Sequence, residues 1–555
     1  MRFKCMSAFL AAVLDLCAVA GTTVWTASPM ARVTPVSAPP PGASTEVSIS
    51  LARRERESAQ VLVTCDADTE LRSVSLVIDP LRFETVGSRV PRDRDELAFS
   101  GSVKWERIGH VPRVPGANPH PNAPPADEKW IPDPLLPVGP FAVERGSTQG
   151  AWITVYAAPD AQAGRYRSRI RVRQGSRILA TVPLTVRVRD FSLGRIFKLD
   201  TAFSLMDGFM RAKYPANWRA MKKQAMDVML DHRLNPDDIS RTTPPEIEDL
   251  LHARERGMSR FNILNIVPEP GSNVQWVCTA RASELFSDAF YPKFRDRLRP
   301  YLSALKAKGL DGLAYVYGFD ECRSKYYAGI DVLWRKFKAD FPNLPMMTTT
   351  TLFRDFAHGW TNSFDCVTTD WYCPVISQYK EAAADRLRAR GKKVWWYTCN
   401  SPPHPYASIS SLEYPPVEGR VLLGCLTWLY RADGFLHWHV NNWRGAAHPT
   451  MDESETRFSE WNLKTRMKMP GDGILLYPGR EHVLPSIRLA NVRDGEEDYE
   501  YLALAEAAVG RERVASIVRR HVVSITKFTR NADALAALRE QLADAIEGKD
   551  LTLHP

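Results

Sequence analysis

The chain has 555 residues, too many for one hydrophobic core of ordinary size, so two or three domains are expected. Hydrophobic residues make up 44% and charged residues 25%, a balance typical of globular proteins and not of disordered or fibrous ones. The formal net charge is +9, but 73 basic residues are mixed with 64 acidic ones without a one-sided basic stripe, which argues against a nucleic-acid partner.

Residues 1–20 have the pattern of a secretory signal peptide. Arg2 and Lys4 precede an apolar stretch of roughly 15 residues, and Ala18-Val19-Ala20 is a small-x-small cleavage site. We therefore expect a periplasmic or secreted protein. Asp15 interrupts the apolar stretch, and a membrane anchor or a mis-assigned start is the alternative. No later run reaches about 18 apolar residues, so no membrane span is predicted.

Nine cysteines are present, and seven of them follow the predicted cleavage site. They are widely spaced and form no C-x-x-C motif. Neither a zinc site nor a dense disulfide framework is indicated.

A Pro-rich linker is predicted over residues 21–45, and an antiparallel β-sandwich over residues 46–192. The sandwich prediction rests on short alternating runs such as E-V-S-I-S-L from Glu46 and A-W-I-T-V-Y-A from Ala151. A long insertion from Pro112 to Pro140 interrupts these runs and reads as a loop. Its apolar residues predict that part of it docks on the rest of the protein.

Strands alternate with amphipathic helical segments over residues 196–460, which predicts a (β/α)8 barrel of the TIM type. The eight strands are expected at Ile196, around Asn235, and at Arg260, Leu313, Met346, Asp365, Lys393 and Gly434. An open doubly wound sheet is the alternative, but no glycine-rich phosphate loop follows a first strand. Residues 461–555 predict a short β piece and helices that pack on the barrel.

The acidic pair Asp320-Glu321 follows the apolar run L-A-Y-V-Y-G, the expected fourth strand. In a (β/α)8 barrel, the carboxyl ends of the strands form the face that carries active sites. Two adjacent carboxylates in a partly desolvated site cannot both ionise freely, so one remains protonated and can act as a general acid. The alternative is structural, because acidic residues also favour the first turn of a helix.

Neighbouring carboxylates are poorly placed to attack a glycosidic bond from opposite sides, which requires a separation of at least about 5 Å. They suit substrate-assisted hydrolysis, in which the 2-acetamido oxygen of the sugar attacks its own anomeric carbon. Glu321 would protonate the leaving oxygen, and Asp320 would hold the acetamido N–H. This mechanism needs neither a metal nor an organic cofactor.

Five further residues near predicted strand ends are candidates for substrate binding: Tyr317, Asp370, Trp371, Tyr397 and Trp438. Tyr397 would donate to the acetamido oxygen, and Trp438 would stack on the sugar ring. Burial in the core is the alternative for the aromatic residues, and a structural cap is the alternative for Asp370. His437 and His439 form an H-x-H pair, but no partner set with metal-ligand spacing accompanies them, so no metal site is predicted.

Five ordered blocks resemble glycoside hydrolase family 123: Y-G-F-D-E from Tyr317, V-W-W-Y-T-C-N-S-P-P-H-P-Y from Val394, G-F-L-H-W-H-V-N-N-W from Gly434, G-D-G-I-L-L-Y-P-G from Gly471 and R-L-A-N-V-R-D-G-E-E-D-Y-E-Y-L from Arg488. The resemblance implies a β-sandwich before a catalytic barrel. It also implies a retaining, substrate-assisted β-N-acetylgalactosaminidase, with Asp320 and Glu321 as the matching catalytic pair. The expected partner is a glycan with terminal N-acetylhexosamine.

Two other functions are compatible with the pattern. A non-catalytic carbohydrate-binding protein would keep the sandwich and the aromatic residues but show no turnover. A metal-dependent barrel hydrolase would contain stoichiometric metal and be sensitive to chelators.

Overall fold

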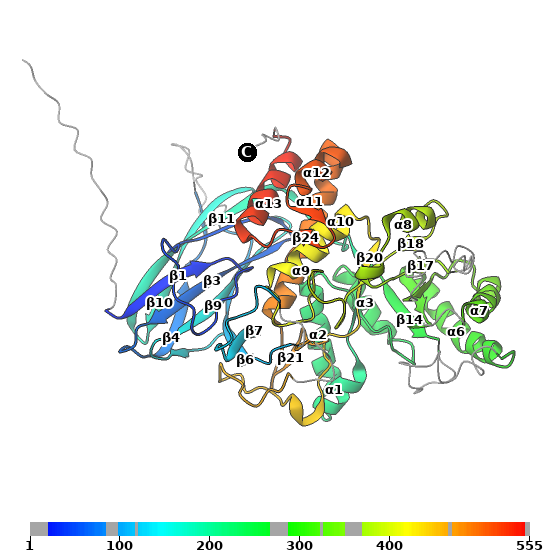
Figure 1. Cartoon of the computed structure of the whole chain (residues 1–555), viewed down its shortest axis with the longest axis horizontal. Coiled ribbons are helices and arrows are strands. Elements are labelled where there is room, and N and C mark those ends of the chain that lie inside the picture. Colours follow the sequence, from blue (N-terminus) through cyan, green and yellow to red (C-terminus); the bar gives the residue numbers. More distant parts are fainter. Residues whose placement is uncertain are drawn as a thin grey trace, which may run out of the picture.

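The computed structural model of the chain describes residues 20–84, 98–116, 120–266, 287–321, 326–349, 369–463 and 469–549. The predicted signal peptide lies outside the described residues, except for Ala20. A two-sheet β region and an α/β region lie side by side, and the C-terminal helices lie above their junction (Figure 1). The expected multidomain β plus α/β fold is thus confirmed.

The β region consists of two sheets that share one apolar core. The first has the order β1-β3-β9-β6-β7, with strands Thr22–Ala27, Arg56–Cys65, Thr148–Ala157, Gly101–Pro112 and Trp130–Leu136. The second has the order β2-β11-β10-β4-β8, with strands Val47–Arg53, Arg177–Ser192, Gly164–Gln174, Leu71–Ile78 and Phe141–Val143, and β5 (Arg82–Phe83) pairs with β10. Inward side chains such as Val61, Ile153 and Val172 are fully buried between them, because alternate residues of each strand face the core.

The predicted linker over residues 21–45 is wrong in its first part. β1 pairs antiparallel with β3, from Thr22 opposite Cys65 to Ala27 opposite Gln60. Trp25 is buried beside Leu62 and donates its indole N–H to Thr64 at 2.9 Å. The short alternating run before the prolines therefore forms an edge strand.

The insertion from Pro112 to Pro140 is not only a loop, because it contains β7. This strand pairs with β6, and its last two residues, Leu135 and Leu136, are buried. Leu135 packs against Ile487 and donates its N–H to the Pro485 carbonyl at 2.9 Å. The predicted docking of the insertion is confirmed.

The α/β region is built on short parallel strands whose residues are almost all buried, as expected for strands covered on both faces. Their ladders run in the orders β13-β12-β20-β19 and β14-β15-β16-β17-β18. The strands span Asp200–Ser204 (β12), Pro236–Asp237 (β13), Phe261–Asn265 (β14), Ala314–Tyr317 (β15), Met346–Thr348 (β16), Trp371–Tyr372 (β17), Lys393–Val394 (β18), Trp396–Tyr397 (β19) and Gly434–His437 (β20).

Two connections join these ladders. β18 and β19 are separated only by Trp395, so they continue one another along the chain. Between β13 and β14, the N–H of Asn262 donates to the Asp237 carboxylate at 2.9 Å, and that of Asn265 donates to the Arg241 carbonyl at 2.9 Å. Each strand position expected from the sequence thus has a counterpart among β12–β20. The match is poorest for the run expected from Asp365, because β17 begins only at Trp371 and residues 365–368 lie outside the described residues.

Helices surround these strands or cover the junction of the two regions. They span Asp207–Lys213 (α1), Trp218–Asp231 (α2), Ile247–Glu255 (α3), Phe290–Ala307 (α6), Tyr327–Asp340 (α7), Glu381–Arg388 (α8), Val417–Val421 (α9), Thr427–Leu429 (α10), Ile487–Val509 (α11), Arg511–Val518 (α12) and Ala532–Ile546 (α13). Two short hairpins lie in the C-terminal part, β21 (Tyr477–Pro478) with β22 (Val483–Leu484), and β23 (Val522–Ser524) with β24 (Lys527–Phe528).

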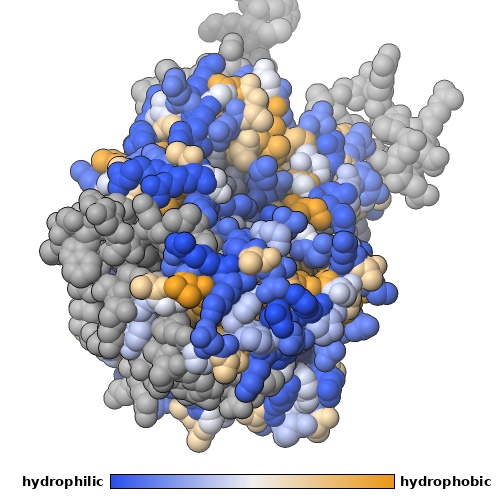
Figure 2. Space-filling model, turned by 90° about the vertical axis from the view of Figure 1, so that its right-hand side faces the viewer, coloured by the Kyte–Doolittle hydropathy of each residue, from blue (hydrophilic) through white to orange (hydrophobic). Residues whose placement is uncertain are grey.

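The surface is mixed in character. On the face that carries α6, α7 and α8, apolar residues form small patches among hydrophilic ones (Figure 2). Within the described part of the chain, no helix is both long enough and apolar enough to cross a membrane.

Candidate active site

The acidic pair lies in a turn directly after β15. Gly318 begins this turn, and a Cβ there would come within 2.7 Å of the Ile266 side chain, so only glycine fits. Because the strands are parallel, the turn lies at the edge where their carboxyl ends meet. Helix α7 begins only at Tyr327, so neither Asp320 nor Glu321 belongs to its first turn.

The backbone of this turn is strained at two non-glycine residues. Phe319 has φ 63° and Glu321 has φ 47°, in the left-handed region that costs an L-residue roughly 1–2 kcal/mol. Phe319 is anchored by an edge-to-face contact with Trp334, whose ring centre lies 5.2 Å away. Such strain persists where the surrounding structure imposes it, which is common at catalytic turns.

Two hydroxyl groups hold the side chain of Asp320. Its Oδ1 lies 2.5 Å from the Tyr317 hydroxyl and 2.7 Å from that of Thr349, and these two hydroxyls are 2.7 Å apart. Thr349 also accepts the backbone N–H of Glu321 at 3.2 Å. Burial, and then the neighbouring Asp320, raise the pKa of Tyr317 well above its usual range, so its hydroxyl remains a donor. Asp320 is thereby fixed in position.

Glu321 meets Tyr397 of β19, whose hydroxyl donates to Oε1. Partial burial of the carboxyl raises the pKa of Glu321, and the neighbouring Asp320 raises it further. The hydrogen bond from Tyr397 lowers it, in opposition to both. The net upward shift favours the protonated acid, as a proton donor to a leaving group requires.

Trp438 follows β20 and is half-buried beside the same cluster of side chains. Its indole N–H lies 3.2 Å from each carboxylate oxygen of Asp472, which is fully buried. Burial raises the pKa of Asp472 to about 6, although hydrogen bonds from Ser410 and Trp438 lower it. The segment that carries Asp472 is held by Arg488, which donates to the carbonyls of Gly471 and Ile474.

Arg488 also links this wall to the β region. Its guanidinium lies 2.9 Å from the carboxylate of Asp133 in β7, and both side chains are at most 5% exposed. The insertion of the β region therefore supports the loop behind Trp438.

Residues 285–505 match the family model of the glycoside hydrolase 123 catalytic domain, and residues 38–174 match that of the glycoside hydrolase 123 N-terminal domain. Together these matches cover more than half of the chain. The chain belongs to glycoside hydrolase family 123. It is a glycosidase that acts on glycans.

One solved structure agrees with this family 123 membership at the level of the fold. The chain is similar to a family 123 glycoside hydrolase from Clostridium perfringens, studied for the hydrolysis of glycolipid glycans, with a TM-score of 0.66 and 12% identity over 95% of this chain and 97% of that one. It is less similar to a family 39 glycoside hydrolase from Bacteroides cellulosilyticus WH2, with a TM-score of 0.34 and 10% identity over 81% and 82% of the two chains. No curated protein sequence matches the chain.

The family 123 chain does not place every predicted substrate-binding residue at this edge. Asp370 immediately precedes β17, so it lies at the opposite, amino-terminal edge of the strands, and its prediction as a sugar ligand is wrong. Its carboxylate lies 2.8 Å from Lys338 Nζ and accepts the N–H of Met346 at 3.1 Å. Asp370 therefore has a structural role, in agreement with the alternative that it caps neighbouring backbone groups.

The prediction that Trp371 binds substrate is also wrong. Trp371 is 5% exposed and stacks on Trp395 at a ring-centre distance of 5.5 Å. Arg260 and Lys393 approach its ring to 5.6 and 5.1 Å, and both lie at or just before the start of a strand. Trp371 is therefore part of the core at the edge opposite the acidic pair.

Tyr317, Tyr397 and Trp438 do lie with the acidic pair at the carboxyl edge. Two residues of the site were not predicted from the sequence: Thr349, which directly follows β16, and Asp472, which lies inside the block G-D-G-I-L-L. Thr349 could have been predicted from its position at the end of a strand. No spacing or periodicity marks Asp472.

His437 and His439 are buried among other side chains. Nδ1 of His437 lies 3.2 Å from the Thr398 carbonyl, and the ring of His439 lies 4.4 Å from that of Trp438. Burial lowers the pKa of both histidines to about 3. Among the described residues, no group of three or more His, Cys, Asp or Glu side chains has the arrangement of a metal site.

Proposed function

We propose that this protein is an exported, retaining glycosidase on a (β/α)8 barrel, and that it removes terminal β-linked N-acetylhexosamine, with N-acetylgalactosamine preferred. It would act in the periplasm or outside the cell by substrate-assisted catalysis, without metal or organic cofactor. The observation that carries the proposal is the division of roles in the acidic pair: Tyr397 contacts Glu321, whereas Tyr317 and Thr349 hold Asp320.

In the proposed first step, the acetamido oxygen of the sugar attacks its anomeric carbon. The bond to the leaving oxygen breaks as that oxygen takes the proton of Glu321, and an oxazolinium ion forms. Asp320 accepts the amide N–H and stabilises the positive charge that develops on the amide. In the second step, Glu321 takes a proton from water, the water oxygen attacks the anomeric carbon, and the bond from that carbon to the acetamido oxygen breaks. This regenerates the acetamido group and restores the original configuration.

Within the described part of the chain, the carboxylates of Asp237 and Asp472 are poor candidates for a protein nucleophile. Asp237 is fully buried and accepts the Tyr315 hydroxyl at 2.7 Å. Asp472 is fully buried and accepts a hydrogen bond from the indole N–H of Trp438. This supports a nucleophile supplied by the substrate. Tyr397, which donates to Glu321, would transfer its hydrogen bond to the acetamido oxygen when the sugar binds.

The test compares hydrolysis of 4-nitrophenyl N-acetyl-β-galactosaminide, the matching glucosaminide and the corresponding glucosamine derivative without the acetyl group. We expect the wild type to cleave only the acetylated sugars and to release a first product that is β-configured by NMR. For Glu321→Gln, we expect kcat to fall by roughly 10²–10⁴-fold when the leaving group is a sugar. An α-configured first product, or equal cleavage of the sugar without the acetyl group, contradicts the mechanism.

A further inference from the structure

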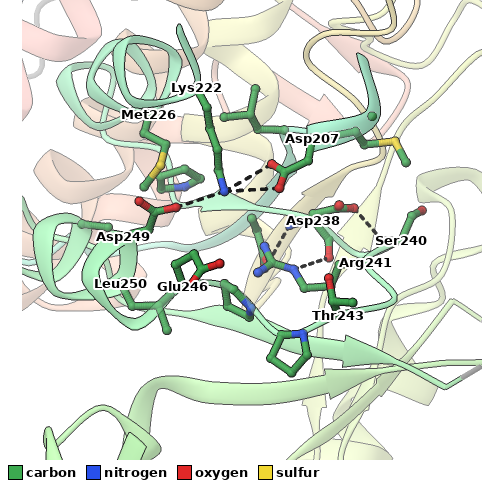
Figure 3. A pocket seen from close by; sticks show the side chains of 18 of the residues that line it. Asp207, Lys222, Met226, Asp238, Ser240, Arg241, Thr243, Glu246, Asp249 and Leu250 are labelled. Atoms are coloured by element: carbon green, nitrogen blue, oxygen red, sulfur yellow. Dashed lines mark hydrogen bonds and ion pairs between the residues drawn. The ribbon is translucent and has the colours of Figure 1, made fainter. Parts of the chain in front are cut away.

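A cleft lies at the same edge of the parallel strands as the acidic pair. Its volume is about 490 Å³, and it lies between the loops after β12 and β13 and the first turns of α2 and α3 (Figure 3). Small-molecule sites usually have volumes of roughly 300–1,000 Å³. We refer to it as the side cleft.

Opposite charges are already paired across the side cleft. Nζ of Lys222 in α2 lies 3.2 Å from Asp207 of α1 and 3.0 Å from Asp249 of α3, and Figure 3 shows it between the two carboxylates. Arg241, in the loop after β13, donates to the Asp238 carbonyl at 3.1 Å and lies 3.5 Å from the Asp237 carboxylate. Arg211, Arg219 and Glu246 also line the cleft, so its lining has four basic and five acidic side chains and no large excess of one sign.

This pairing decides which ligand chemistry fits. An anion would have to approach Asp207 and Asp249, and a cation would have to approach Lys222. A hydroxyl group fits both signs, because it donates to a carboxylate while it accepts from an ammonium group. Buried Met226, Leu250 and Met258 add apolar lining that can contact the C–H faces of a sugar ring.

Asp238 places a buried carboxyl group in the wall of the side cleft. It is 8% exposed and lines the cleft, and its Oδ1 accepts the N–H of Ser240 at 2.8 Å. Within the described part of the chain, Oδ2 takes part in no hydrogen bond. Burial raises the pKa of Asp238 to about 7, against the opposing charge of Arg241, so near neutral pH this carboxyl can donate to or accept from a hydroxyl.

We propose that the side cleft binds a neutral, hydroxyl-rich sugar unit, in the part of the glycan beyond the residue that is cleaved. The inference rests on the proposed function, because that function supplies a glycan to this edge of the strands. It adds a carbohydrate-binding site to the acidic pair, with Asp207, Lys222, Asp238 and Asp249 as its polar contacts.

Ligand-observed NMR titration of methyl β-lactoside, with full-length Glu321→Gln protein, tests this without turnover. Gly208→Phe is the blocking variant: Gly208 lines the cleft, and a Cβ there meets no heavy atom within 4 Å. Gly312→Phe is the matched control, since its Cβ position is equally open but it lies just before β15, at the opposite edge of the strands. Lys222→Met removes the central cation independently of steric blocking.

We expect both cleft variants to weaken lactoside binding at least tenfold and the control to leave it unchanged. Methyl β-glucuronide and methyl β-glucosaminide, which carry a negative and a positive charge, should bind more weakly than the lactoside. The proposal is overturned if lactoside does not bind, if Gly208→Phe binds it as well as the control does, or if a charged sugar binds more tightly. Because turnover plays no part, failure of the proposed function appears separately, as a wild type that does not hydrolyse the aryl glycosides.

Discussion

Tyr397 donates its hydroxyl hydrogen to Glu321, a residue 76 positions earlier in the chain, and so joins the end of β19 to the turn after β15. This contact opposes the two influences that raise the pKa of Glu321, which are partial burial of the carboxyl and the neighbouring Asp320. The pKa of Glu321 therefore depends on a balance between burial, Asp320 and Tyr397, and the two side chains can be changed separately.

Tyr397→Phe should move the basic limb of the pH dependence of kcat/KM to higher pH. The hydrogen bond lowers the pKa of Glu321, so its removal raises that pKa further. A general acid is active when protonated, and activity falls as pH rises through its pKa. The measurement is the pH profile of hydrolysis of a β-linked N-acetylgalactosaminide with a sugar leaving group, which requires the proton of Glu321.

Tyr379→Phe is a suitable control for that profile. The Tyr379 hydroxyl also donates to an oxygen, the Tyr430 carbonyl at 2.6 Å, but it lies outside the site. Its removal should leave the position of the basic limb unchanged. An unshifted limb in Tyr397→Phe would show that the contact with Glu321 does not tune the acid.

Asp320→Asn should shift the same limb in the opposite direction. The charge of Asp320 raises the pKa of Glu321, so its removal lowers that pKa, and Glu321 loses its proton at lower pH. The variant also loses the negative charge that stabilises the proposed oxazolinium ion, so kcat should fall by roughly 10²–10⁴-fold. A shift to higher pH, or an undiminished kcat, contradicts the role given to Asp320.

The acidic pair was predictable because a buried apolar run marks the strand before it. Asp370 was placed wrongly for a related reason: the sequence suggested a strand that ends near Asp370, whereas β17 begins at Trp371. A shift of a few residues along a short strand moves a side chain from one edge of the sheet to the other. The strand was identified correctly, but its limits depend on ladders with distant neighbours.

Contacts between distant segments explain what the sequence could not reveal. Thr349 reaches Asp320 across 29 positions, and Trp438 reaches Asp472 across 34. These partners come together through strand register and through a loop held by Arg488, and neither leaves a local pattern in the chain. The edge strand β1 was missed because the prolines that follow it resemble a linker.

Replacement of Glu321 by glycine should cost less stability than replacement by alanine. The residue has φ 47°, where alanine is strained and glycine is not. The expected difference in free energy of unfolding is about 1 kcal/mol in favour of glycine. Denaturant unfolding of the two inactive variants measures it.

The same pair of substitutions at Glu248 provides the reference. This exposed residue lies in helix α3, where alanine should be the more stable by about 1 kcal/mol. If glycine is the less stable at both positions, the backbone at Glu321 is not strained.

The hydrogen bond between Trp438 and Asp472 should set the orientation of the proposed sugar platform. Asp472→Asn keeps an oxygen that accepts the indole N–H, whereas Asp472→Ala leaves that buried donor unpaired at a cost of about 1–3 kcal/mol. We therefore expect Asp472→Ala to raise KM for the aryl glycoside roughly tenfold, with a smaller change in kcat, and Asp472→Asn to retain most of the wild-type KM.

Trp438→Phe removes the same donor, so combining it with Asp472→Ala should add little to the loss from either change alone. Equal loss in the Asn and Ala variants, or full additivity with Trp438→Phe, would show that Asp472 acts on the fold and not through Trp438.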